Sequence, residues 1–259
     1  MPRFAANLSM MFNEVPFLER FKAAAAAGFT AVEFLFPYEF SPEEVESKAK
    51  AAGTQIVLFN MPAGNWAAGE RGITGLPGRE AEFRDGVEKA LVYAERLGTP
   101  RLHAMAGIAP AGADAAACRA TLITNLKFAA EKLAAKNITL LLEAINTRDM
   151  PGFIVSTQKD SHAICEAVGA SNLKMQMDLY HMQVMEGDLA TSLKRYAQMF
   201  GHIQIAGCPE RHEPDTGEVR YEYLYRLLDE IGYPGWLGCE YRPAGKTADG
   251  LAWFSAATR

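Results

Sequence analysis

Short runs of apolar and β-branched residues recur along the chain, and each precedes a longer stretch in which apolar residues return every three or four positions. The short runs predict β-strands and the longer stretches predict amphipathic helices. Eight strands are expected, at residues 3–7, 31–36, 55–60, 101–105, 139–143, 173–178, 202–206 and 236–241. This regular alternation predicts an α/β protein with a parallel sheet.

The helical stretches have recognisable ends. Segments 14–28, 41–53 and 79–98 each finish at glycine, which favours the left-handed backbone that closes a helix. Eight strand–helix units predict a single (β/α)8 TIM barrel over residues 1–259, although an open doubly wound sheet gives the same alternation. The barrel is favoured because no glycine-rich turn follows the first strand, where a dinucleotide-binding sheet would place one.

Polar side chains lie at the ends of four consecutive predicted strands. Glu143 and Asp178 end the fifth and sixth strands, Gln204 lies in the seventh and Glu240 in the eighth. Active sites of TIM barrels form at the carboxyl ends of the strands, so these side chains should converge. Any one carboxylate could equally be a salt-bridge partner or a strand cap. Three together would repel one another, and a bound divalent cation removes that cost.

The four converging side chains offer only oxygen ligands. Such a set suits Mg²⁺ or Mn²⁺ better than zinc, which favours histidine or cysteine. We therefore expect a divalent metal at the barrel mouth, held by Glu143, Asp178, Gln204 and Glu240. A carboxylate beside a divalent cation can remove a proton next to a carbonyl, because the cation stabilises the charge that develops on oxygen.

Composition disfavours several other classes. The net charge is −5 and the basic residues are scattered, so neither nucleic acid nor an anionic membrane is an expected partner. No apolar run approaches the roughly 20 residues that span a bilayer, and the first residues lack the apolar core of a signal peptide, which predicts a cytoplasmic protein. The four cysteines show no paired spacing, so reduced thiols are expected. A homo-oligomer is left open.

Six segments then carry a resemblance that runs nearly end to end: PRFAANLSMMFNEVPF, GFTAVEFLFPYEF, LLLEAIN, MDLYHMQ, HIQIAGCPERHEPDTGE and GWLGCEYRP. They resemble the hydroxypyruvate isomerase family of xylose-isomerase-like barrels, and within it the 2-oxo-tetronate isomerases most of all. The resemblance implies a metal-dependent isomerase that acts through an enediolate on a small sugar acid. The expected reaction converts hydroxypyruvate to tartronate semialdehyde, or 2-oxo-tetronate to 3-oxo-tetronate.

The resemblance also implies roles for particular residues. Glu143 and Glu240 would bind the metal and exchange the substrate proton from either side, while Asp178 and Gln204 would complete the ligand set. It further implies that two more side chains contact substrate oxygens, His181 and Arg211.

Arg211 is also the candidate for holding the substrate carboxylate, because arginine offers two parallel donors. It could instead pair with Glu210 or Glu213 on the surface, just as His181 could simply cap a strand.

Three other functions stay open. Related ketose 3-epimerases have histidine where this chain has Gln204, which weakens the transfer of that activity but leaves it as the first alternative. An endonuclease-type phosphodiesterase on the same barrel would need several zinc ions, many histidines and a basic face. A barrel that binds a sugar acid without turning it over would leave Glu143 and Glu240 unexplained.

The sequence assigns no role to several further residues. Glu33 and His103 lie inside strands and could reach the pocket; a core polar group is the favoured interpretation for His103, and Glu33 is evenly balanced. His202 begins a strand and is expected to face the far end of the barrel. The glycine-rich loop 61–78, which contains Trp66, is expected to be a functional lid or a flexible segment.

Overall fold

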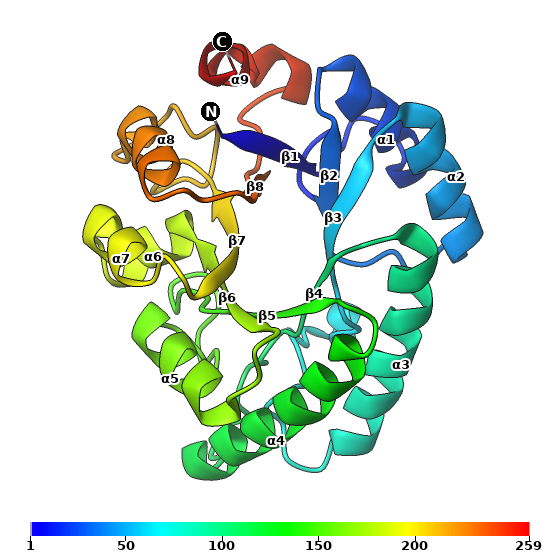
Figure 1. Cartoon of the computed structure of the whole chain (residues 1–259), viewed down its shortest axis with the longest axis vertical. Helices are drawn as coiled ribbons and strands as arrows, with labels where there is room; N and C mark the ends of the chain where they lie inside the picture. Colours follow the sequence, from blue (N-terminus) through cyan, green and yellow to red (C-terminus); the bar gives the residue numbers. More distant parts are fainter. Residues whose placement is uncertain (1, 259) are drawn as a thin grey trace.

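Eight parallel strands close into a barrel in the computed structural model, which describes residues 2–258 (Figure 1). Each strand pairs with its neighbours in chain order, and the ring closes where the first strand pairs with the last. The predicted TIM barrel is therefore confirmed. The strands are β1 (Arg3–Asn7), β2 (Ala31–Phe34), β3 (Gln55–Asn60), β4 (Arg101–His103), β5 (Thr139–Glu143), β6 (Leu173–Asp178), β7 (Phe200–Ile205) and β8 (Trp236–Cys239).

Helices form a ring around the strands, as Figure 1 shows. They are α1 (Phe17–Ala26), α2 (Pro42–Ala52), α3 (Glu80–Leu97), α4 (Ala115–Ala134), α5 (Gln158–Val168), α6 (Leu179–Met185), α7 (Leu189–Arg195), α8 (Tyr221–Glu230) and α9 (Ala252–Ala257), with short 3₁₀ helices η1 (Trp66–Ala68) and η2 (Thr247–Gly250). Among the described residues, no helix combines the length and the apolar character that crossing a membrane requires.

Local sequence explains where helix α2 begins and ends. The Ser41 hydroxyl accepts a hydrogen bond from the Glu44 N–H at 3.3 Å, and the Glu44 carboxylate accepts one from the Ser41 N–H at 2.9 Å. This reciprocal capping satisfies donors that the first turn leaves free, and Pro42 suits the first helical position. The helix ends at Gly53, whose φ of 66° is the left-handed conformation that glycine adopts without strain.

Four predicted strands are too long at their carboxyl ends. Strands β2, β4 and β8 end two residues earlier than expected and β7 ends one residue earlier, and the residues beyond β4, β7 and β8 are buried in loops. Tyr241, for example, is fully buried and contacts Trp253 of α9. Glu240 consequently lies just beyond β8. The seventh strand begins two residues earlier than predicted, at Phe200.

The barrel interior changes from apolar to polar along the strands. A small cluster of buried residues that includes Ala5, Ala31, Leu58 and Leu141 fills its middle. Side chains two positions further along a strand point to the same face, so polar residues follow these apolar ones at the carboxyl ends. The larger apolar cluster lies between strands and helices. The barrel thus has a packed base and a polar mouth.

Candidate active site

A cavity of about 250 Å³ lies at the carboxyl ends of the strands. Each strand contributes a polar side chain to its wall, at or near the carboxyl end: Asn7, Glu33, Asn60, His103, Glu143, Gln176, Gln204 and Glu240. The loops above the barrel add further residues, including Trp66 and Arg71 from the segment between β3 and α3. The cavity is small and polar compared with typical ligand pockets, which suits a small polar ligand.

Three of the predicted carboxylates gather around one arginine. Arg211 Nη2 lies 3.1 Å from Asp178 Oδ2 and 2.8 Å from Glu240 Oε2, so it bridges strands β6 and β8. Arg211 is buried and has a φ of 60°, a left-handed backbone that is uncommon outside glycine. The surface pairing with Glu210 or Glu213 does not occur. Backbone strain of this kind is often found at active sites.

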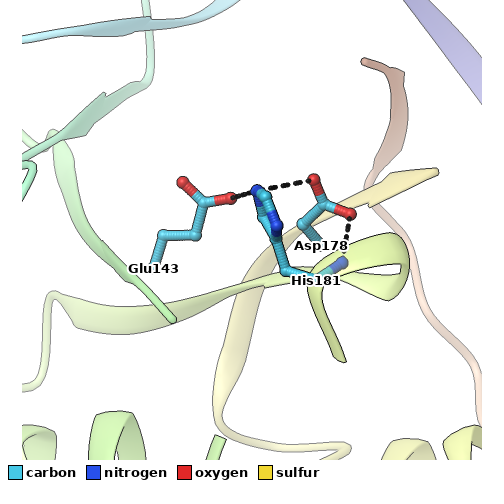
Figure 2. Close-up of side chains that lie close together, drawn as sticks. All are labelled: Glu143, Asp178 and His181. Carbon is cyan, nitrogen blue, oxygen red and sulfur yellow. Dashed lines mark hydrogen bonds and ion pairs between the residues drawn. The ribbon is translucent and has the colours of Figure 1, made fainter. Parts of the chain in front are cut away.

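Glu143 belongs to the same cluster. Figure 2 shows His181 between the Glu143 and Asp178 carboxylates, with His181 Nε2 at 3.8 Å from Glu143 Oε1 and at 3.6 Å from Asp178 Oδ2. Asp178 also caps helix α6 by accepting a hydrogen bond from the Tyr180 N–H at 2.8 Å. This cap fixes the first turn of α6, which carries His181, against the end of β6.

Burial and mutual repulsion shift the acidity of these carboxyls. Burial raises the pKa of Glu143 well above its usual range, and the Glu240 and Asp178 carboxylates raise it further. Burial also raises the pKa of Glu240, to about 8, although Arg211 opposes the shift. The pKa of Asp178 is raised by burial, again against Arg211. One arginine therefore compensates only part of the charge of three buried carboxylates.

The hydrogen-bond network fixes the tautomer of His181. The Asn146 side-chain oxygen accepts a hydrogen bond from the Asp149 N–H at 2.7 Å, which orients the amide so that its Nδ2 lies 2.6 Å from His181 Nδ1. His181 Nδ1 is then the acceptor and its Nε2 carries the proton. Burial, together with Arg211 and Arg148, lowers the His181 pKa well below its usual value, so the ring is neutral.

Asn146 was missed by the sequence reasoning. It is fully buried and lies three residues beyond Glu143, at the end of the stretch that continues β5. The signal in the sequence is an amide side chain only a few residues beyond a carboxylate that ends a strand. With Nε2 as donor, His181 is suited to contact a substrate oxygen rather than to bind a cation through that nitrogen.

Gln204 lines the pocket but makes no contact with the three clustered carboxylates. Its Nε2 donates to Glu33 Oε1 at 2.7 Å, and its Oε1 accepts a hydrogen bond from Gln176 Nε2 at 2.7 Å. These two bonds fix the amide so that its nitrogen faces Glu33. The oxygen keeps one lone pair for another partner, because a carbonyl oxygen has two.

Glu33 anchors a polar layer at the floor of the pocket. Its carboxylate lies 2.6 Å from His202 Nε2 and accepts a hydrogen bond from Asn7 Nδ2 at 3.1 Å, while Asn7 Nδ2 is also 3.3 Å from Glu240 Oε1. Gly238 makes room for it, because a Cβ at that position would lie 2.3 Å from Glu33 Oε2. His202 therefore points into the barrel, one layer below Gln204.

His103 borders the pocket as well. Its Nδ1 lies 3.3 Å from Asn60 Oδ1 and 3.7 Å from Glu143 Oε2, and its buried Nε2 has no hydrogen-bond partner among the described residues. Burial, reinforced by His202, lowers its pKa to about 3, so the ring is neutral. His103 is thus a wall of the site beside Glu143 rather than a core group remote from it.

The donor set at the mouth fits a divalent cation. Glu143 Oε1 is buried and forms no hydrogen bond, which leaves an acidic oxygen available for a ligand. Glu143, Asp178 and His181 form a close group in which one ligand atom of each lies within 4.8 Å of the others; its two carboxylates are the candidate cation ligands, since His181 Nε2 carries a proton. Among the described residues this is the one such group of three, and it holds a single histidine, so the many-histidine zinc site of a phosphodiesterase is not found there.

The fold and the site define an enzyme of the TIM-barrel class with a carboxylate cluster at its mouth. The profile of the family described as xylose isomerase-like TIM barrel matches residues 21–257. A 2-oxo-tetronate isomerase from Cupriavidus necator is 58% identical and a hydroxypyruvate isomerase from Escherichia coli is 47% identical, each over 98% of both chains. The chain therefore belongs to the xylose isomerase-like TIM-barrel family, within the group that contains these 2-oxo-tetronate and hydroxypyruvate isomerases, and it is an isomerase, as predicted.

Solved structures are similar as well. A Brucella melitensis protein named AP endonuclease, family 2, is 53% identical and superposes with a TM-score of 0.97, with 99% of each chain covered. A 3-keto-D-glucoside 4-epimerase from E. coli is 19% identical with a TM-score of 0.82 over 99% of both chains. At that identity the second similarity concerns the fold alone.

Proposed function

We propose that the chain is a metal-dependent isomerase of a small 2-oxo acid. It would interconvert hydroxypyruvate and tartronate semialdehyde, or 2-oxo-tetronate and 3-oxo-tetronate, through an enediolate. The observation that carries this proposal is the convergence of Glu143 and Glu240, both buried and both of raised pKa, on one small pocket. The names of the full-length relatives support the choice of substrates.

The reaction moves two hydrogens between neighbouring carbon and oxygen atoms. One glutamate removes a proton from C3, and a proton is returned at C2 to give the isomer, with Glu143 and Glu240 as the two exchanging groups. The hydroxyl proton must pass from the C3 oxygen to the C2 oxygen. His181 Nε2–H, beside Glu143 and Asp178, is the donor placed to bond those oxygens, and Arg211 is the second.

Mg²⁺ or Mn²⁺ would be held by Glu143, Asp178, Gln204 and Glu240. When bound, such a cation stabilises negative charge on the substrate oxygens as a Lewis acid. The buried Glu143 oxygen without a partner and the incompletely balanced charge of the cluster support this ligand set. For Gln204 the support is the free lone pair of an oxygen whose amide nitrogen is held by Glu33.

Turnover by the metal-stripped enzyme tests the proposal. Hydroxypyruvate and 2-oxo-tetronate would each be assayed with and without added Mg²⁺ or Mn²⁺, alongside a neutral ketose as the substrate of an epimerase. We expect isomerisation of at least one acid that is lost on stripping and restored by metal. Turnover of the ketose without turnover of either acid would favour 3-epimerisation over the proposed reaction. Full activity without metal would show that the reaction does not need the cation.

A further inference from the structure

Arg71 is a charged residue of the pocket wall that the proposed mechanism does not use. It lies just beyond η1 in the loop between β3 and α3, half-buried in the pocket wall. Its guanidinium stacks over the Trp66 ring, with Cζ 4.0 Å from the ring centroid, and Nη1 donates to the backbone oxygens of Trp66 and Glu70 at 3.1 and 2.8 Å. The side chain is therefore held in place before any ligand arrives.

The charge of Arg71 is not balanced by the protein. Its neighbour Glu70 is already paired with Arg79, with Arg79 Nη1 at 2.7 Å from Glu70 Oε1. No carboxylate of the described residues forms an ion pair with Arg71, and its Nε and Nη2 have no hydrogen-bond acceptor there. Arg211 differs, because Asp178 and Glu240 already engage it.

The loop that carries Arg71 is braced against the barrel. Gly72 forms an isolated bridge with Ala106, and the Thr74 hydroxyl donates to the Met105 oxygen at 2.8 Å. Asn125 of α4 in turn donates to the Thr74 oxygen at 2.8 Å. A guanidinium on such a segment can act as a fixed binding group.

We propose that Arg71 binds the carboxylate of the acid substrate. The inference rests on the proposed function and deepens it. In a 2-oxo acid the reacting atoms are C2 and C3, whose oxygens belong beside Glu143, Glu240 and His181, while the carboxylate at C1 does not react. The free Nε and Nη2 of Arg71 form one edge of a guanidinium and match the two oxygens of a carboxylate.

This assignment changes the role predicted for Arg211. A substrate carboxylate beside Arg211 would meet the charges of Asp178 and Glu240 within the same contact distance. Arg211 thus remains the predicted partner of the oxygens at the reacting carbons. Arg71 then selects acids over neutral ketoses, since a ketose offers no charge for it.

Matched probes and variants test the assignment. Hydroxypyruvate and dihydroxyacetone differ only in a carboxylate against a CH₂OH group. For Arg71→Met we expect KM for hydroxypyruvate, or for 2-oxo-tetronate if that is the acid turned over, to rise roughly ten- to hundredfold. The change in kcat should stay within about threefold, inhibition by dihydroxyacetone should be unchanged, and Arg71→Lys should recover part of the loss.

Arg242→Met is the control, because the exposed Arg242 side chain lines the same pocket and carries the same charge without a side-chain partner among the described residues. An equal rise in KM for both variants would mean that Arg71 acts only through its positive charge and does not bind the carboxylate. Inhibition by dihydroxyacetone weakened as much as binding of the acid would mean that Arg71 only maintains the shape of the pocket. Either result overturns the inference. If the wild type turned over neither acid, the proposed function would fail. Calorimetry would then test the inference separately. Weaker binding of hydroxypyruvate to Arg71→Met than to the wild type would support it, and equal binding would overturn it.

Discussion

At the scale of single residues, the two glutamates are the first test of the mechanism. Glu143→Gln and Glu240→Gln keep the shape of the side chain and remove the group that exchanges a proton. We expect each to lower kcat by on the order of 10²–10⁴-fold. The barrel should remain folded, because each substitution also relieves repulsion within a buried cluster. Steady-state turnover and thermal melting measure the two effects.

Glu222→Gln provides the comparison for these variants, because Glu222 is an exposed carboxylate on α8 outside the pocket. Its turnover should equal that of the wild type. A Glu143 or Glu240 variant with the same turnover as the Glu222 variant would lose its place in the mechanism.

The tautomer of His181 gives a second prediction. Asn146→Asp replaces the amide donor with an acceptor, which draws the ring proton to Nδ1 and leaves Nε2 without the hydrogen that faces the substrate. Asn146→Ala leaves both tautomers accessible. We expect kcat to fall roughly 10–100-fold in the aspartate variant and less in the alanine variant.

Nitrogen-15 chemical shifts of the His181 ring report the tautomer directly. They should show protonated Nε2 in the wild type and protonated Nδ1 in Asn146→Asp. An aspartate variant with unchanged shifts and unchanged kcat would refute the orientation of the Asn146 amide.

Sequence reasoning locates the carboxylates better than it locates their partners. A charged residue at the end of an apolar strand, such as Glu143, can be recognised from the sequence alone. Because the strand ends of a parallel barrel meet at the same rim, such residues are expected to converge. The role of Asn146 was not visible, because it depends on which way an amide turns. His202 faces Glu33 through a contact between residues 169 positions apart, which no local pattern contains.

At the scale of elements, the loop between β3 and α3 can be tested through its backbone. Gly72 has a φ of 114°, and a Cβ there would lie 2.3 Å from the Met105 carbonyl oxygen. Gly72→Ala should therefore displace the segment beside Arg71 and lower kcat/KM for the acid by at least roughly tenfold, with a loss of stability of about 1–3 kcal/mol.

Gly53→Ala is a matched control, since Gly53 also has a positive φ but its Cβ would meet no atom within 4 Å. It should cost about 1–2 kcal/mol of stability without changing kcat/KM. Chemical denaturation and initial rates separate the two effects. If both variants lost the same activity, the loop position would be irrelevant to catalysis.

The same loop shows where prediction from sequence ends for an element. Its glycines indicate an irregular segment, and the sequence left a lid and a flexible segment as alternatives. The structure instead ties residues 72–74 of the loop to the segment after β4, through Met105 and Ala106, and to α4 through Asn125. Those partners lie some 30 to 50 residues further along the chain than the loop residues that they contact. The contacts therefore cannot be predicted from the loop sequence, because they form only when the neighbouring strand–helix units pack together.

At the scale of the whole molecule, the site depends on closure of the barrel. Asn7 and Glu240 are 233 positions apart and come within 3.3 Å because β1 pairs with β8. The count of eight strand–helix units, together with the absence of a glycine-rich turn after the first strand, predicted this closure. An open sheet would leave Glu33 of β2 distant from His202 and Gln204 of β7, and the polar layer at the floor of the pocket would not form.

Closure of the barrel brings buried carboxyls together, and their shifted pKa values predict how stability varies with pH when no metal is bound. The Glu240 carboxyl, with a pKa raised from 4.5 to about 8, binds its proton more tightly in the folded state than in the unfolded state. Its contribution to the free energy of unfolding is fully present below about pH 4.5 and is lost as the pH rises through about 8. The neutral rings of His103 and His181 oppose this trend only below about pH 7.

We therefore expect the free energy of unfolding of the metal-stripped protein to fall between about pH 7 and 8.5. The stabilisation produced by added Mn²⁺ should grow over the same interval, because protons and the cation compete for the same carboxylates. Urea unfolding at several pH values, with chelator or with Mn²⁺, measures both. Glu240→Gln should flatten the first dependence. A stability that rises with pH in the stripped wild type would mean that these carboxyls are already ionised in the folded barrel, and Arg211 would then balance more of their charge than its two contacts indicate.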